Sequence, residues 1–257
     1  MIDVLSILPD FDRATEVGSK WLEKFHEICY KDSNEQRLTF LKGDRAYEPN
    51  IWEIIKTSNP KVITLIGHGN HDVVTCQDHD VLFMRDERTK KMVKEKIIIL
   101  LSCSTGKAGG IAEWLVKEAG AQAVICYSEN YIFLAGHDVY ESPFFESHCM
   151  GDFVIAHEGT VEEAVQKMYD TYTELINDPK VPEDCKPWLM WDRDCLKYYG
   201  DGFAKITDKA PDPPENELPW WWYATLGIGI SLIALGVISF IRLIFYGLFF
   251  LFFKGIT

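Results

Sequence analysis

Short apolar runs alternate along the chain with segments of helical period. Residues 62–66 (VITLI) and 97–101 (IIILL) are apolar throughout, which is typical of strands that are buried on both faces of a sheet. Further strands are expected at 4–8, 38–41 and 121–127. This alternation predicts an α/β fold, with a mostly parallel sheet flanked by helices.

The segments between these strands carry apolar residues at helical spacing. After the first strand, the residues that share one helical face are Val17, Trp21, Leu22, Phe25 and Ile28. Shorter helices are expected at 50–57, 90–95 and 109–119, and a small hairpin is expected at 73–83. A later helix opens at Thr160, which is spaced from Glu163 as in a capping box.

The C-terminal part of the chain has a different composition. Residues 220–257 contain no Asp or Glu and are almost continuously apolar. A helix of about 20 apolar residues crosses a bilayer core, so we expect residues 224–241 to span a membrane, with Arg242 at the far face. The four prolines in residues 209–219 indicate a stiff spacer. The chain therefore divides into an α/β domain at 1–208, this linker, and a membrane anchor.

Charge and cysteine content restrict the partners and the compartment. All 39 acidic residues, but only 24 of the 26 basic ones, precede residue 220, so the α/β domain is strongly acidic. Such a charge argues against binding to the phosphate backbone of nucleic acids. The seven cysteines are odd in number and irregularly spaced, which favours reduced thiols. With no signal-peptide pattern at residues 1–8, we expect a cytoplasmic domain held at a membrane by a single C-terminal helix that contacts lipid.

Two reactive side chains take equivalent positions after the two most apolar strands. His68 is the second residue after 62–66, and Cys103 is the second residue after 97–101. Neighbouring parallel strands lie about 4.8 Å apart and end at the same edge of a sheet, so we expect the imidazole and the thiol to lie close together. A helix shortly after Cys103 would favour its thiolate. The backbone N–H groups of Gly69 and Cys103 would then bind a developing oxyanion.

The residues around Cys103 resemble a known family. The run IIILLSCSTG, followed by IAEWLVKEAGAQAVICYSE, resembles the CHAT and gingipain branches of the caspase-like cysteine peptidases. In that family a Cys-x-Thr-Gly stretch ends one strand, and His-Gly ends the preceding central strand, as His68 and Gly69 do here. The resemblance covers residues 4–176. It implies a caspase-like fold, Cys103 as nucleophile, His68 as base or acid, Gly69 in the oxyanion hole, protein or peptide substrates, and no cofactor.

The preferred substrate residue stays open. Some relatives carry an acid two residues before the nucleophile, and Leu101 takes that position here. Three other acids are candidates for a pocket that accepts a basic side chain, although each also fits an ordinary solvated carboxylate. These candidates are Glu129, Asp138 and Asp78.

Two other classes of function compete with the peptidase. The GNHD run that starts at Gly69 is similar to a motif of metallophosphoesterases, but their Asp-x-His and Gly-His-x-His motifs are missing. A zinc site is a related alternative, and its candidate ligands are His68, His71, Cys76 and His79. The third class is a non-catalytic, membrane-tethered adaptor of caspase-like fold. We expect a membrane-anchored cysteine endopeptidase with a Cys103–His68 dyad, without a metal, acting on proteins at the membrane.

Overall fold

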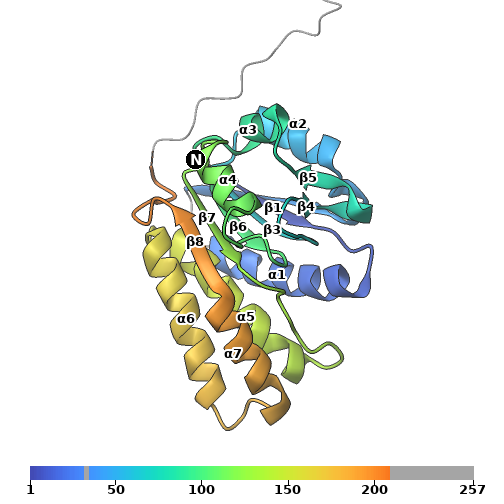
Figure 1. The fold of residues 1–257 in the computed structure, drawn as a ribbon, viewed down its shortest axis with the longest axis vertical. Coiled ribbons are helices and arrows are strands. Elements are labelled where there is room, and N and C mark those ends of the chain that lie inside the picture. Colours follow the sequence, from blue (N-terminus) through green and yellow to red (C-terminus); the bar gives the residue numbers. More distant parts are fainter. Residues whose placement is uncertain (32–34, 209–257) are drawn as a thin grey trace, which may run out of the picture. The chain divides into compact units, whose positions relative to one another are not determined.

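The computed structural model describes residues 1–31 and 35–208 of the chain (Figure 1). Within these two ranges, no helix has the length and apolar character needed to cross a bilayer. The expected linker at 209–219 and the expected span at 224–241 lie outside the described residues.

Six strands form one sheet in the order β2-β1-β3-β6-β7-β8. The strands are β1 (Ile2–Leu8), β2 (Gln36–Lys42), β3 (Val62–Ile66), β6 (Ile97–Leu101), β7 (Ala123–Tyr127) and β8 (Leu196–Gly200). Every neighbouring pair is parallel except β7 and β8. The expected mostly parallel sheet is therefore confirmed, and β3 and β6 have the expected bounds because each is a fully apolar, fully buried strand.

One face of the sheet is covered by short helices and a hairpin. These elements are α2 (Glu48–Ser58), α3 (Glu87–Val93), α4 (Ile111–Lys117), β4 (Val74–Thr75) and β5 (Val81–Phe83). Alternate residues of the central strands, such as Ile63 and Ile98, pack against them. The hairpin is antiparallel, as expected. The shorter 3₁₀ turns are Gly43–Arg45, Gln77–His79 and Glu183–Cys185.

The opposite face is covered by the longer helices (Figure 1). They are α1 (Arg13–Lys31), α5 (Asp138–Ala156), α6 (Val161–Asn177) and α7 (Lys186–Cys195), the last packing on α6. Thr160 and Glu163 form the expected capping box at the start of α6. Ile28 was expected on the buried face of α1, but this prediction is wrong, because its side chain is 57% exposed.

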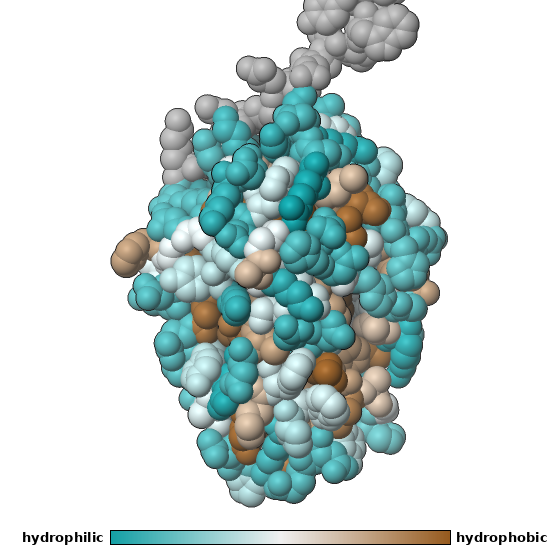
Figure 2. Space-filling view, in the orientation of Figure 1, coloured by the Kyte–Doolittle hydropathy of each residue, from teal (hydrophilic) through white to brown (hydrophobic). Residues whose placement is uncertain are grey.

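The buried side of α1 is more polar than its apolar spacing predicts. His26, Cys29 and Tyr30 are buried in place of Ile28, because they face α5. On the outside, hydrophilic residues cover most of the face in Figure 2, and hydrophobic ones form small separate areas. The apolar residues of the described chain are thus concentrated in the layers between sheet and helices.

Candidate functional site

The carboxyl ends of β3 and β6 bring His68 and Cys103 to one pocket. The two strands are parallel neighbours with Ile66 opposite Leu101, and the N–H of Gly67 donates to the Leu101 carbonyl at 3.2 Å. Ile66 and Leu101 both face the layer of α1 and α5. The pocket is lined by Ala14, Thr15, Ile66, Gly67, His68, Leu101, Ser102, Cys103, Tyr131 and Phe133. A reagent of modest size can therefore meet the imidazole and the thiol together.

Gly69 lies against the loop that carries the thiol. A Cβ atom at this position would collide with Ser102 Oγ, and it would lie 3.1 Å from the Cys103 carbonyl oxygen. Gly69 pairs with Val74 in an isolated antiparallel bridge whose hydrogen bonds are made by the residues on either side. Within the described residues, neither the Gly69 N–H nor the Cys103 N–H donates a hydrogen bond. Both donors are thus available to a ligand.

Asp12 binds the imidazole of His68. Nε2 of His68 lies 2.6 Å from Asp12 Oδ2, and the other carboxylate oxygen accepts the N–H of Thr15 at 2.9 Å. Burial acts to raise the pKa of Asp12, but the hydrogen bonds from Thr15 and His68 outweigh it, so the pKa is lowered and the carboxylate is charged. With Nε2–H donating to Asp12, Nδ1 keeps a lone pair. His68 is therefore oriented to accept a proton at Nδ1.

The pairing of Asp12 with His68 was not expected from the sequence. Asp12 follows β1, which is the other neighbour of β3 in the sheet. The same rule about strand ends that selected His68 would therefore have selected Asp12, had the strand order been known. Asp12 also caps α1, because it accepts the N–H of Thr15 at the third position of the helix.

Cys103 is the least buried of the seven cysteines, all of which are free thiols. Its Sγ donates to the carbonyl oxygen of Tyr131 at 3.9 Å. Burial raises the pKa of the Cys103 thiol above its ordinary value. The helix expected at 109–119 is α4, and the N–H of its first residue, Ile111, donates to the carbonyl oxygen of His71 at 2.7 Å. The resting thiol is consequently protonated at neutral pH.

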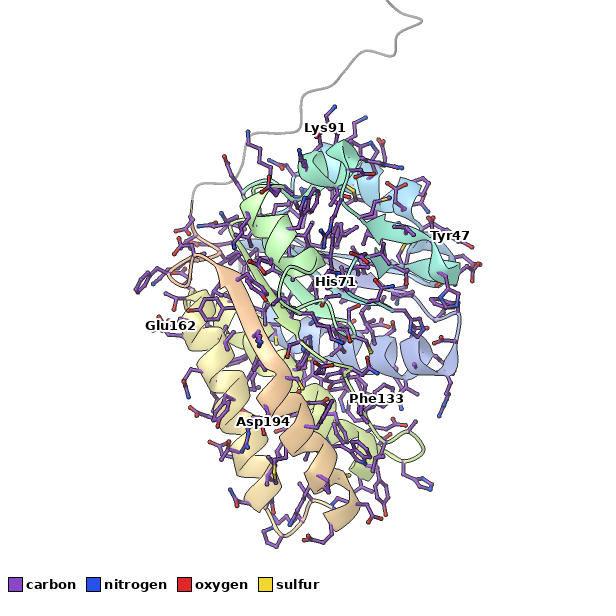
Figure 3. All side chains as sticks on the ribbon, viewed as in Figure 1. Tyr47, His71, Lys91, Phe133, Glu162 and Asp194 are labelled. Atoms are coloured by element: carbon purple, nitrogen blue, oxygen red, sulfur yellow. The ribbon has the colours of Figure 1, made fainter. Side chains whose placement is uncertain are left out.

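A segment after β7 forms the wall of the pocket opposite the thiol. It contributes Tyr131, whose carbonyl accepts the thiol, and Phe133, which Figure 3 labels. Asp192 of α7 accepts the N–H of Ile132 at 3.0 Å, and the indole of Trp191 donates to the Asn130 carbonyl at 2.8 Å. Helix α7, which the sequence analysis did not identify, thus fixes this wall.

The three acids proposed for substrate binding lie outside this pocket. Glu129 pairs with Lys107 at 3.2 Å, and Asp138 pairs with a lysine of α1 at 3.4 Å. Asp78 accepts a hydrogen bond from the hydroxyl of Tyr47. None of the three is among the residues that line the pocket around Cys103. Their role in substrate binding stays a prediction.

The GNHD run forms a turn. The side-chain oxygen of Asn70 accepts the N–H groups of Asp72 and Val73 at 2.7 and 3.1 Å, and the imidazole of His71 (Figure 3) lies 2.9 Å from an Asp72 oxygen. These contacts shape the entry to the hairpin. In the described part of the chain, the alternative zinc ligands around His68 do not form a group that could hold a metal ion, and the group that could consists of His26, Cys149 and Asp152. The zinc alternative at this position is therefore wrong.

Known proteins similar to this chain are found among solved structures. No family model matches the chain, and no curated protein matches it either. Among solved structures, the chain is similar to the Arg-specific cysteine proteinase gingipain R of Porphyromonas gingivalis, with 13% identity and a TM-score of 0.48 over 82% of this chain and 48% of that one. The chain thus spans about half the length of that structure.

Two further solved structures are similar to this chain. A secreted cysteine protease from Bacteroides thetaiotaomicron, solved with an irreversible peptide inhibitor, has 11% identity and a TM-score of 0.45 over 68% of this chain and 59% of its own. Caspase-1 from Spodoptera frugiperda has 12% identity and a TM-score of 0.46 over 81% of this chain and 91% of its own. All three similarities are distant, with TM-scores below 0.5 and identities of 11–13%.

Proposed function

We propose that this chain is a cysteine endopeptidase in which Cys103 is the nucleophile and His68 carries the proton. The observation that supports this most directly is the shared pocket at the ends of β3 and β6, which both side chains line. The bond from Asp12 to Nε2 of His68 leaves Nδ1 as the proton acceptor. A thiol, an oriented imidazole and two free backbone donors are the groups that acyl transfer requires.

The reaction follows from these groups. Nδ1 of His68 takes the proton of the Cys103 thiol, and the sulfur bonds to the substrate carbonyl carbon. The N–H groups of Gly69 and Cys103 bind the oxyanion that forms. The imidazolium then gives its proton to the leaving amine as the C–N bond breaks. Water gives a proton to His68 as it attacks the thioester, and the departing sulfur takes that proton back from the imidazolium, which restores the thiol and releases the carboxyl product.

The contacts of Cys103 in the free enzyme indicate when its thiol proton moves to His68. The thiol is hydrogen-bonded to the Tyr131 carbonyl, and burial raises its pKa. A standing thiolate–imidazolium pair is therefore disfavoured in the free enzyme. We infer that Cys103 rotates from Tyr131 toward His68 when substrate enters, so that proton transfer accompanies attack.

The pocket also favours a class of substrate side chain. Besides His68, it is lined by apolar residues such as Ile66 and Phe133 and by small polar ones, with no carboxylate. A basic side chain would lose its hydration there, and Asp12, the carboxylate that contacts the lining residue His68, is already bound by that imidazole and by Thr15. We therefore expect cleavage next to an uncharged residue.

Attachment to a membrane completes the proposal. The apolar composition of residues 220–257 supports a single C-terminal anchor, with the peptidase domain on the cytoplasmic side. Anchoring would raise the effective concentration of substrates that lie on the same membrane. Retention of the full chain, but not of a chain ending at residue 208, in carbonate-washed membranes is the expected result. Release of the full chain would contradict it.

Cleavage of a peptide library tests the peptidase directly. We expect the purified chain to cut a small set of peptides, and we expect Cys103→Ala and His68→Ala each to abolish turnover without a change in Tm. The matched control is Cys195→Ala, which removes a buried thiol from the end of α7. A folded wild-type chain that cuts nothing would favour the adaptor, and turnover that survives Cys103→Ala would exclude the proposed nucleophile.

A further inference from the structure

A cluster of buried polar side chains lies between α1 and α5, away from the candidate active site. His26 of α1 and Asp152 of α5 are both completely buried, and Nε2 of the first lies 3.4 Å from Oδ2 of the second. Neither of these two atoms has a hydrogen-bond partner. A buried carboxylate oxygen and a buried imidazole nitrogen that lack hydrogen bonds are costly, and a cation between these two atoms would compensate both.

A third group points to the chemistry of that ligand. Ligand atoms of His26, Cys149 and Asp152 all lie within 4.8 Å of one another, and in the described residues no other group of this kind occurs. Imidazole nitrogen, thiolate sulfur and carboxylate oxygen are together the ligands that Zn²⁺ prefers. A divalent cation would satisfy the unpartnered nitrogen and oxygen at once.

The spacing along the two helices supplies a fourth ligand. Cys29 follows His26 by three residues on α1, and Asp152 follows Cys149 by three residues on α5. Residues three apart share a helical face, and these two helices pack against each other (Figure 1). Cys29 is buried on the same helix as His26, but it is not one of the three residues whose ligand atoms lie within 4.8 Å of one another, so its side chain would have to rotate to reach the ion. Each helix thus carries two candidate ligands, and three of the four already lie close together.

Outer hydrogen bonds already orient two of the ligands. Oγ of Ser6 lies 2.9 Å from Nδ1 of His26, where it can accept the Nδ1 proton and leave Nε2 with a lone pair. The hydroxyl of Tyr30 donates to Oδ1 of Asp152 at 3.2 Å, which leaves Oδ2 free. Metal ligands in proteins are commonly held by such outer partners.

From this geometry we propose that His26, Cys29, Cys149 and Asp152 bind one Zn²⁺ ion that joins α1 to α5. Binding releases the two thiol protons to solvent, and the ion compensates the buried thiolates and the carboxylate. Its role is structural, because four buried protein ligands would fill the tetrahedral coordination of the ion and none of them lines the pocket that contains Cys103. The bound ion would hold α1, whose first turn carries Asp12, against the rest of the domain.

Metal analysis of the full chain, purified in detergent from zinc-supplemented culture, tests this proposal without using activity. We expect one zinc per chain, and we expect a strong chelator to lower Tm by at least about 5 °C. Exchange of zinc for Co²⁺ should give a near-ultraviolet sulfur-to-metal charge-transfer band. Cys29→Ser and Cys149→Ser should each weaken that band about twofold or abolish it.

Three controls make the outcome decisive. Cys126→Ser removes a buried thiol from β7 and should leave metal content unchanged. Cys103→Ala should also retain one zinc, which separates this site from the proposed catalytic pair. A folded wild-type chain without zinc and without a Co²⁺ band would overturn the proposal, and so would full metal content in Cys149→Ser. Asp152→Asn, which keeps the shape of the side chain, should lose metal even if His26→Gln fails to fold.

Discussion

Replacing Asp12 by Asn is the most informative change near the proposed catalytic pair. Asp12 has two roles, because one oxygen binds His68 and the other caps α1. Asparagine is as good a helix cap as aspartate, so Asp12→Asn removes the charge and keeps the cap. Asp12→Ala removes both, and Asp12→Glu keeps the charge on a longer side chain.

The structure sets the size of the expected effect. A hydrogen bond to a charged group contributes about 1.5–3 kcal/mol, and 1.36 kcal/mol corresponds to a tenfold change. The side chains of His68 and Asp12 are 41% and 36% exposed, so solvent screens part of the interaction. We therefore expect Asp12→Asn to lower kcat by roughly 10- to 100-fold, because the imidazole loses its orientation and the imidazolium loses its counter-charge.

Steady-state kinetics and thermal unfolding separate the two roles. Asp12→Asn should lower kcat with KM and Tm unchanged, and Asp12→Glu should recover part of the rate. Asp12→Ala should lose about 1 kcal/mol of stability as well, which lowers Tm by about 2–4 °C. If Asp12→Asn had the kcat of the wild type, Asp12 would act only on the helix. A decrease in kcat that occurs only in variants with a lowered Tm would lead to the same conclusion.

Three further predictions concern the thiol, the glycine beside it and a buried lysine. Alkylation of Cys103 by iodoacetamide should have a pH midpoint above about 8.5, since burial raises the pKa of the thiol; a midpoint below about 7 would show a preformed thiolate. Gly69→Ala should abolish turnover and lower Tm, because its methyl group meets Ser102 Oγ, and Ser102→Ala should restore part of the stability. Burial lowers the pKa of Lys96 to about 8, so the unfolded state binds more protons between about pH 8 and 10.4, and the free energy of unfolding rises across that window. Lys96→Met should remove this pH dependence, so the stability difference between the variant and the wild type should fall by roughly 3 kcal/mol from pH 7 to pH 10.4, on top of a pH-independent loss of the hydrogen bond from Lys96 Nζ to Asn59; a difference that stays constant with pH in denaturant titrations would contradict the assignment.

The central strands and the candidate pair were predictable because their signals are local. Runs such as VITLI and IIILL, which are apolar at every position, indicate strands that are buried on both faces of a sheet. Both strands have the expected bounds. Their adjacency in the sheet puts His68 and Cys103 at one pocket, as the strand-end argument predicts. The alternating pattern also identified the hairpin and the cap at Thr160.

The elements that escaped prediction lack such a pattern. Helix α5 is buried around much of its circumference and includes buried polar residues such as His148 and Asp152, so it has no clear apolar stripe. Strand β8 is short, only partly buried and antiparallel to β7, which the parallel pattern does not indicate. The contacts that α7 makes with the wall of the pocket depend on tertiary packing, since Asp192 and Ile132 are 60 residues apart.

Covalent labelling mapped by peptide mass spectrometry tests the central claim most directly. An acyloxymethyl ketone with an uncharged recognition residue should form one thioether per chain, on Cys103, with the carboxylate leaving group released. His68→Ala should slow that labelling by at least about 100-fold, while Cys195→Ala should not change it. Adducts spread over several cysteines, or equal labelling with and without the His68 imidazole, would contradict a nucleophile activated at the ends of β3 and β6.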